Sequence, residues 1–346
     1  MIENSRESKN DKDISAQLIR VLKTYGGDRK QALKEHVRLD YLYALSDQRE
    51  NLVEWYPFGA NGRILEVGSG YGALTGVYSR KAAYVDVLDE SQDNLEVNRL
   101  RHVELGGREN IRYIKGNIRG LASDVLKDMD LGKAETLQAA RYDYIVFAGT
   151  LGENAGEEIR AAKSLLKPGG ELIIAACNPF GLKYWAGAKK DPYSFSKEAL
   201  IRLLSETGDG GDMEFYYPMP DYRIPVTIFS DQYLPGKGDL TDTVTAYDYP
   251  GYLSLDIGAA FDAVCQDGQF DRYANAYLAI WRQAGAAAER EAGDHADGCR
   301  AEYIKYNRTR KEEFQIKTAI LGKPRRVEKT ALVRAGIEHI ASFEEK

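Results

Sequence analysis

The sequence predicts an α/β fold in which a mainly parallel, doubly wound sheet is covered by helices on both faces. Three observations support this prediction. Short apolar runs alternate with segments in which apolar residues recur at helical spacing, which is typical of βαβ units. A glycine-rich turn directly follows the first run, where such sheets bind ligands. The predicted strands are residues 63–67, 84–88, 111–114, 144–147 and 171–176.

The segments between these runs predict the helical layers. Residues 1–60 are expected to form an N-terminal helical segment, in which Gly26-Gly27-Asp28 separates two helices. Within the alternating region, apolar residues recur every three or four positions. The predicted helices are residues 73–81, 92–105, 121–140 and 157–166.

The pattern loosens beyond Cys177. Residues 178–192 contain Gly, Pro, Lys and aromatic residues and predict an irregular, lid-like segment. A helix is predicted over 195–207, and Ser196 is its expected N-cap because a serine side chain can accept a bond from a free helical N–H.

Two aromatic, β-prone runs at 213–217 and 274–281 predict later strands. We expect them to close a domain over 61–283 that has a functional insertion at about 218–270, because so long a plain loop is unusual in a compact domain. Residues 284–298 look like a linker or an exposed helix. A small α+β extension over 297–346 is predicted to hold strands at 301–305, 314–320 and 326–332 and a helix over 333–343.

Composition excludes several classes of protein. The chain has 346 residues, a net charge of −6 and a pI of about 5.5, which disfavours nucleic-acid binding. Its three cysteines, Cys177, Cys265 and Cys299, form no metal or disulfide pattern, so we expect no metal site and a cytoplasmic location. The sequence contains no apolar run of eighteen residues, so we predict no membrane span.

The glycine turn comprises Glu66-Val67-Gly68-Ser69-Gly70-Tyr71-Gly72. Glycines at alternate positions let the backbone lie directly against a ligand, near the N-terminus of the following helix. A dinucleotide fingerprint needs a wider last spacing, which disfavours a nicotinamide dehydrogenase, and no phosphate-binding GK[ST] motif follows. Taken by itself, this spacing is only moderately specific.

Polar residues at the ends of the next strands supply further binding candidates. Asp89 ends the second strand, where a ribose diol needs a bidentate acceptor; it could equally cap the helix at Gln92. Asn117 follows the third strand and can pair with an adenine edge, although Gly-Asn is also an ordinary turn. The remaining candidates beside them are Glu90, Ile118 and Gly149.

A helix stop and turn is expected at Pro168-Gly169-Gly170, before the strand predicted at 171–176. On these motifs together, residues 63–176 resemble the class I S-adenosylmethionine-dependent methyltransferases. The resemblance implies a seven-stranded sheet of order 3-2-1-4-5-7-6, whose last two strands, 213–217 and 274–281, pair antiparallel. It also implies S-adenosylmethionine as cofactor and S-adenosylhomocysteine as product. The implied contacts are Glu66, Gly68, Ser69, Gly70, Gly72, Asp89, Glu90, Asn117, Ile118 and Gly149; the family often has Asp where Asn117 stands.

No residue is singled out as the catalytic base. Glu153 and Asn154 lie just beyond the fourth strand but could simply cap the next helix. His36 could reach over the cofactor, or pack between helices. Tyr222 belongs to a tyrosine-rich run that could line an acceptor pocket or serve as plain packing.

The acceptor is expected to be a small molecule or a saccharide that is methylated on oxygen. Residues 195–198 through 229–235 loosely resemble methyltransferase modules of bacterial glycan or cell-envelope loci, which suggests the saccharide. Two alternatives stay open: a peptide or protein methyltransferase, and a cofactor-binding regulator without activity.

The C-terminal extension offers a separate resemblance. Lys329 on a strand and Glu338 on a following helix resemble the opening of a kinase-like small lobe, without its catalytic loop. An unrelated hairpin with a helix is equally compatible. A homodimer, or a larger fusion partner, is left open.

Overall fold

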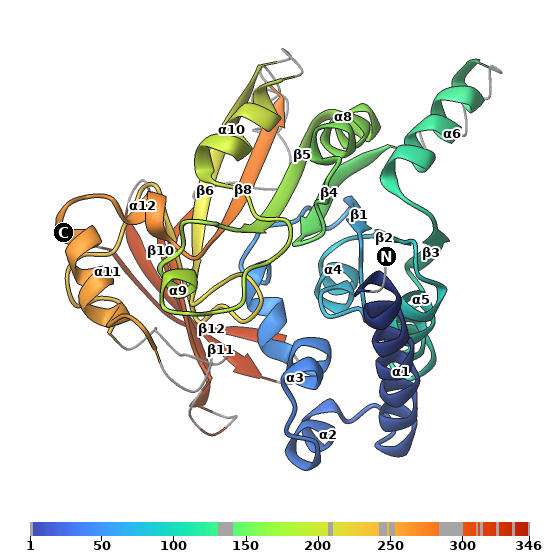
Figure 1. The fold of residues 1–346 in the computed structure, drawn as a ribbon, viewed down its shortest axis with the longest axis horizontal. Helices are drawn as coiled ribbons and strands as arrows, with labels where there is room; N and C mark the ends of the chain where they lie inside the picture. Colours follow the sequence, from blue (N-terminus) through green and yellow to red (C-terminus); the bar gives the residue numbers. More distant parts are fainter. Residues whose placement is uncertain are drawn as a thin grey trace. The chain divides into compact units, whose positions relative to one another are not determined.

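The computed structural model describes residues 3–130, 141–206, 210–241, 248, 253–283, 300–308, 311, 314–322, 325–333 and 336–344 (Figure 1). The chain divides into two compact units. Unit 1 comprises Met1–Glu50, Pro57–Thr150 and Asn154–Leu172. Unit 2 comprises Asn51–Tyr56, Leu151–Glu153 and Ile173–Lys346.

Unit 1 contains the alternating strands and helices and the N-terminal helices. Strand β5 begins in this unit and ends in unit 2, and the short helix η1 also crosses the boundary. The elements are α1 (Glu3–Thr24), α2 (Arg29–Glu35), α3 (Leu39–Leu45), η1 (Asp47–Leu52), β1 (Arg63–Val67), α4 (Thr75–Lys81), β2 (Tyr84–Asp89), α5 (Gln92–Arg99), η2 (Leu100–Glu104), β3 (Ile111–Lys115), α6 (Ile118–Asp130), β4 (Tyr142–Ala148), α8 (Ala155–Leu165) and β5 (Leu166–Cys177).

The sheet of unit 1 has the strand order β5-β4-β1-β2-β3. Strand β1 pairs in parallel with β2 on one side and β4 on the other, and β2 pairs in parallel with β3. Ile64 and Leu65 on β1 are fully buried, as expected for a central strand covered on both faces. The carboxyl ends of β1, β2, β3 and β4 therefore meet at one edge of the sheet.

The N-terminal helices pack on α5. Leu18 and Leu22 of α1, Tyr41 and Leu45 of α3, and Val97 of α5 belong to one buried apolar cluster. Helix α1 ends at Thr24 and α2 begins at Arg29, so the break predicted at Gly26-Gly27-Asp28 is confirmed. Asp28 caps α2, because its side chain accepts from the Gln31 amide at 3.1 Å.

Unit 2 contains most of the later strands. Their order is β12-β11-β10-β9-β7-β6-β8. The elements are α9 (Leu182–Trp185), α10 (Lys197–Ser205), β6 (Gly211–Met219), β7 (Thr227–Ser230), α11 (Ile257–Gln266), α12 (Phe270–Tyr273), β8 (Ala276–Gln283), β9 (Ala301–Asn307), β10 (Ile316–Leu321), β11 (Arg326–Val333) and β12 (Gly336–Glu344).

Neighbouring strands of unit 2 pair antiparallel. β6 pairs with β8 through Met213 opposite Trp281, which confirms the predicted antiparallel pair. β7 lies between β6 and β9, so the predicted insertion supplies a strand to this sheet. Ser196 caps α10 by accepting from the Ala199 amide at 3.2 Å, as predicted.

The C-terminal strands are joined to the short segment Asn51–Tyr56 of the same unit. Glu54 is buried and accepts from the Tyr306 hydroxyl at 2.9 Å and from Lys317 Nζ at 3.1 Å. Asn51 accepts two hydrogen bonds from Arg308, at 2.8 and 3.0 Å. Buried polar groups of strands β9 and β10 thus depend on residues about 250 positions earlier for their partners.

Three sequence predictions are corrected. The described residues form twelve strands in a mixed parallel and antiparallel arrangement, rather than a mainly parallel seven-stranded sheet, because residues 227–230 and 301–344 add strands. The helix predicted over 333–343 is wrong, since Gly336–Glu344 is strand β12 and pairs with β11; the extension is therefore not α+β in its described part. Pro168 to Gly170, expected to form a turn, lie within β5.

Other predictions fall partly outside the described residues. Residues 131–140 of the predicted helix 121–140 and the linker residues 284–298 lie there. Within the part of the chain that the structure describes, we find no helix whose length and apolar character would let it span a bilayer.

Candidate functional site

The glycine turn connects β1 to α4 at the carboxyl edge of the unit 1 sheet. Gly68, Gly70 and Gly72 have φ angles of 70°, 52° and 74°, a left-handed conformation that side chains rarely adopt. Because β1 lies between β2 and β4, the turn leaves the sheet where ligands bind in α/β folds.

The three glycines of the turn differ in what surrounds them. A Cβ on Gly68 would lie 2.7 Å from Thr150, and one on Gly72 would lie 2.6 Å from Asn98, so both positions are closed by protein. A Cβ on Gly70 would meet no atom within 4 Å. Gly70 therefore presents bare backbone to open space, as a backbone cradle for a ligand requires.

Asp89 ends β2 beside Gly70. Its Oδ2 accepts the Gly70 amide at 2.9 Å, while Oδ1 accepts the Ser91 amide at 2.9 Å and the Asn94 side chain at 3.1 Å. These three donors fix the carboxylate, and Oδ2 keeps room for a further donor. The structure therefore brings Asp89 next to the glycine turn, while its predicted contact with a ribose stays a prediction.

Asp86, the other acid within β2, is fully engaged elsewhere. Its buried carboxylate accepts from Arg63 at 2.7 Å, from Arg112 at 2.8 and 2.9 Å, and from the Tyr142 hydroxyl at 2.9 Å. These partners compensate the buried negative charge of Asp86, so this residue has a structural role. Asp89 is then the acid of β2 that contacts the glycine turn.

Glu90 and Asn117 meet at the same edge. Asn117 Nδ2 donates to Glu90 Oε1 at 2.7 Å, and its Oδ1 accepts the Gly120 amide at 3.0 Å at the start of α6. Both side chains are exposed, whereas Ile118 is buried. Asn117 thus caps α6, and its exposed side chain could still form further hydrogen bonds. A turn residue and an adenine contact therefore both stay possible for this position.

Gly149 lies one residue beyond β4. Val67 of β1 pairs with Phe147 of β4, so Gly149 stands next to the glycine turn at the sheet edge. The neighbouring Thr150 hydroxyl donates to the Val67 carbonyl at 2.7 Å and helps fix this end of β1.

Glu66 is buried beneath the turn rather than exposed at the edge. Its Oε2 accepts the Thr75 hydroxyl at 2.5 Å. Burial raises the pKa of Glu66 to about 8, and the negative charge of Asp89 adds to the rise. A carboxyl in this state exchanges a proton near neutral pH, so the charge under the turn depends on pH.

A chain of hydrogen bonds behind Glu66 was not anticipated from the sequence. The Tyr113 hydroxyl donates to Asn98 Oδ1 at 3.1 Å, and Asn98 Nδ2 donates to Thr75 Oγ1 at 2.8 Å. Thr75 then donates to Glu66, so β3, α5, α4 and β1 are connected. The available signal was a polar Asn98 between the apolar residues Val97 and Leu100 on the buried face of α5.

The catalytic candidates are divided between the units. In unit 1, His36 packs between the rings of Tyr25 and Tyr41, at centroid distances of 5.9 and 5.7 Å, and Asn154 is the exposed N-cap residue of α8 without a side-chain cap bond. In unit 2, Glu153 is exposed and Tyr222 is buried. Their catalytic roles stay predictions.

Unit 2 contains a buried cluster of charges near the carboxyl end of β5. Lys183 Nζ donates to Asp221 at 2.6 Å and to Asp248 at 2.8 Å, and only 2% of its side chain is exposed. Arg223 donates to Asp191 at 2.6 Å. Because the two aspartates raise the pKa of Lys183, it stays protonated and holds the 178–192 segment to the chain that follows β6.

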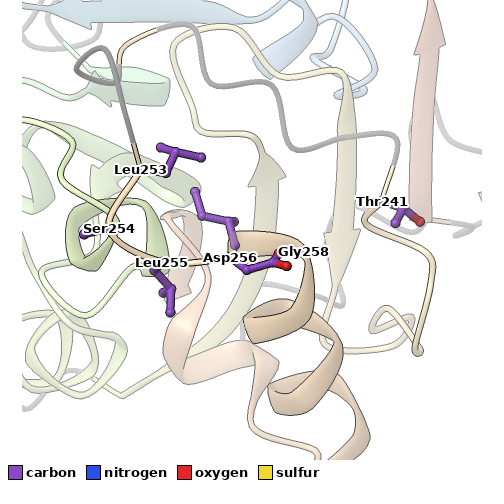
Figure 2. Close-up of a pocket in the computed structure, with 7 residues that line it drawn as sticks. Thr241, Leu253, Ser254, Leu255, Asp256 and Gly258 are labelled. Carbon is purple, nitrogen blue, oxygen red and sulfur yellow. The ribbon is translucent and has the colours of Figure 1, made fainter.

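A cavity of about 540 Å³ lies within the predicted insertion in unit 2 (Figure 2). Leu253 to Asp256, which lead into α11, and the first two residues of that helix line it, and Thr241 lies across from them. Asp256 is already the cap of α11, accepting the Ala259 amide at 3.0 Å. None of the predicted site residues lines this cavity, so we assign no reaction to it.

Comparisons with known proteins give sequence relatives that are methyltransferases. No family model matches the chain. It is 30% identical over 140 residues to the ubiquinone biosynthesis O-methyltransferase of Xanthomonas axonopodis pv. citri (strain 306), covering 40% of this chain and 52% of that protein. The enzyme of the same name from Xanthomonas euvesicatoria pv. vesicatoria (strain 85-10) is 29% identical over the same shares. The chain thus spans about half the length of the curated relatives it matches.

Among solved structures, the chain matches the N-methyltransferase NodS from Bradyrhizobium japonicum WM9 in complex with S-adenosyl-L-homocysteine. This match has 16% identity and a TM-score of 0.39, and covers 69% of this chain and 86% of that one. The sequence relatives confirm the resemblance to methyltransferases, while the looser resemblance to glycan-locus modules stays a prediction.

Proposed function

We propose that this chain, similar over part of its length to methyltransferases, is an S-adenosylmethionine-dependent methyltransferase whose unit 1 binds the cofactor. The observation that carries the proposal is the pairing of Asp89 with the Gly70 amide at 2.9 Å. It sets a carboxylate acceptor beside exposed backbone at the carboxyl edge of a parallel sheet.

The residues at this edge suit the separate parts of such a cofactor. Asp89 would accept a ribose hydroxyl, and the exposed pair Glu90 and Asn117 would meet the adenine edge. Gly68 to Gly72 would lie along the methionine part, with Gly149 beside them. Bound there, the cofactor supplies a methyl group activated by its sulfonium.

We infer further that the acceptor is a small molecule or saccharide methylated on a hydroxyl oxygen. The sequence relatives are ubiquinone biosynthesis O-methyltransferases, which supports this acceptor class. In such a transfer the acceptor oxygen would bond to the methyl carbon as the bond from that carbon to the sulfonium sulfur breaks, S-adenosylhomocysteine would leave, and the hydroxyl proton would pass to a base. Glu153 and His36 are the candidates to accept that proton, while Asn154 and Tyr222 are candidates to position the acceptor by hydrogen bonding.

Transfer of a labelled methyl group from S-adenosylmethionine tests the proposed activity. The purified chain is incubated with matched panels of phenols, monosaccharides and peptides, and the label is followed into each class by mass spectrometry. We expect label in a phenol or saccharide, and strongly reduced label at the same cofactor concentration when Asp89 is replaced by alanine. Label confined to peptides would contradict the acceptor class, and label in no class would contradict the activity.

A further inference from the structure

Helix α5 ends in an unusual turn behind the glycine turn. Residues Leu100–Glu104 form the π-helical turn η2, in which the Leu105 amide bonds to the Leu100 carbonyl at 2.9 Å. Such wide turns are rare, and they occur frequently at functional sites. Here the turn presents two consecutive polar residues, Arg101 and His102, both buried, to the inside of unit 1.

His102 holds one carbonyl of the glycine turn. Its Nε2 lies 2.7 Å from the Gly72 carbonyl oxygen. A carbonyl can only accept, so Nε2 carries the ring proton and donates. Burial, with the positive charges of Arg101, Arg29 and Arg80 nearby, lowers the pKa of His102 to about 2, so the ring stays neutral and this bond does not titrate near neutral pH.

Arg101 holds the preceding carbonyl and joins it to an N-terminal helix. Its Nη1 donates to the Ala44 carbonyl in α3 at 2.5 Å and lies 3.4 Å from the Tyr71 carbonyl. Burial lowers the pKa of Arg101 to about 9, which still leaves it charged at neutral pH. Consecutive residues of η2 thus face the consecutive carbonyls of Tyr71 and Gly72.

The packing around these contacts is tight. A Cβ on Gly76 of α4 would lie 2.8 Å from the His102 ring, so the absence of a side chain there lets the ring approach. Asn98, one helical turn earlier, closes the space beside Gly72. The glycine turn therefore has little freedom to change conformation while α5 and η2 stay in place.

We propose that Arg101 and His102 are positioning residues, which fix the Tyr71 and Gly72 carbonyls and thereby hold the backbone of the glycine turn in the one conformation that would receive the cofactor. This inference deepens the proposed function and rests on it. Neither residue needs to contact the cofactor, because each acts through the backbone of the turn. The energetic gain is preorganisation: the turn does not have to be ordered when the ligand binds.

The test compares His102→Leu, which removes the donor, with His102→Gln, which keeps an N–H donor. The matched control is Asn110→Leu, because Asn110 also donates to backbone carbonyls, those of Ser79 and Ala82 at 3.0 Å, at the far end of α4. Each variant of the full chain is measured for S-adenosylhomocysteine affinity, unfolding free energy and amide hydrogen exchange over residues 68–76 without ligand.

We expect His102→Leu to bind S-adenosylhomocysteine about tenfold more weakly and to exchange faster over 68–76. His102→Gln should recover most of the affinity, and Asn110→Leu should lose stability with its affinity unchanged. If His102→Leu and Asn110→Leu lose equal stability and also show equal changes in S-adenosylhomocysteine affinity and in exchange over 68–76, the inference is overturned. If the unsubstituted chain does not bind S-adenosylhomocysteine, the proposed function fails, and the exchange of 68–76 still decides the positioning role.

Discussion

The two aspartates of β2 show how surroundings separate residues of identical chemistry. Asp86 is enclosed by Arg63, Arg112 and Tyr142, which use its acceptor capacity. Asp89, three residues later, is held by neutral backbone and amide donors at the sheet edge. Only the second arrangement leaves a carboxylate oxygen available to a ligand.

Replacing Asp89 by alanine is expected to weaken S-adenosylhomocysteine binding at least about 100-fold. A charge-assisted contact to the ribose is lost together with the bond that orients Gly70, and two such bonds are together worth about 3 kcal/mol or more. Calorimetric titration measures the change. Glu96→Ala, an exposed acid on α5, is the control and should bind normally; equal affinities for all three proteins would move the ribose contact elsewhere.

Glu66 gives the stability a specific pH dependence. Burial raises its pKa from 4.5 to about 8, so between these values the folded chain holds a proton that the unfolded chain releases. The unfolding free energy contributed by this group therefore falls as pH rises through that interval. Glu66→Gln cannot titrate, so its unfolding free energy should fall less between about pH 5 and about pH 9, by up to a few kcal/mol. Denaturant unfolding of both proteins at these two pH values measures the difference. The same slope in both proteins would contradict the assignment.

At the scale of the element, we expect different glycines of the turn to serve stability and binding. Alanine at Gly72 forces a left-handed alanine and places its Cβ 2.6 Å from Asn98, so we expect a stability loss clearly above the 1–2 kcal/mol of the backbone alone. Alanine at Gly70 carries only the backbone cost, but its Cβ projects into the open space where we propose that the ligand binds. Melting curves and S-adenosylhomocysteine titrations should therefore rank the two variants in opposite order; the same order in both would contradict this view of the turn.

The sequence predicted the elements of unit 1 well because their signals are local. Apolar runs such as 63–67 and the glycine turn follow from residue type and spacing alone. The error at 333–343 has a non-local cause: Gly336–Glu344 contains helix-compatible residues, but pairing with β11 decides its conformation. The contact of His102 with Gly72 could likewise not be predicted from local sequence, because the two residues are thirty positions apart. A polar residue on the buried face of a helix does not reveal which group it will bond to.

At the scale of the whole molecule, the C-terminal strands are integral to unit 2. β9 pairs with β7, and Ile304 and Tyr306 are buried together with the Glu54 contact. Lys329 does lie on a strand, but Glu338, which a kinase-like lobe would need on a helix, lies on β12 opposite Ala331. The described extension therefore behaves as part of a sheet, and its kinase-like origin stays a prediction.

A chain that ends before residue 300 should accordingly lose at least about 3 kcal/mol of unfolding free energy, because the burial of Ile304 and Tyr306 is lost and the β7 edge is uncovered. Removal of only 336–346, which takes away the outermost strand, is the control and should cost less. Denaturant unfolding followed by circular dichroism measures both. Unchanged stability of the shorter chain would mean that the strands are an independent appendage.

Unit 1 is proposed to bind S-adenosylmethionine through the glycine turn and Asp89. Isothermal titration of the full chain with S-adenosylhomocysteine tests it most directly, with NAD titrated in parallel. We predict saturable one-site binding of S-adenosylhomocysteine, strongly weakened in Asp89→Ala, and no comparable binding of NAD. Absence of S-adenosylhomocysteine binding, or tighter binding of NAD, would contradict the claim.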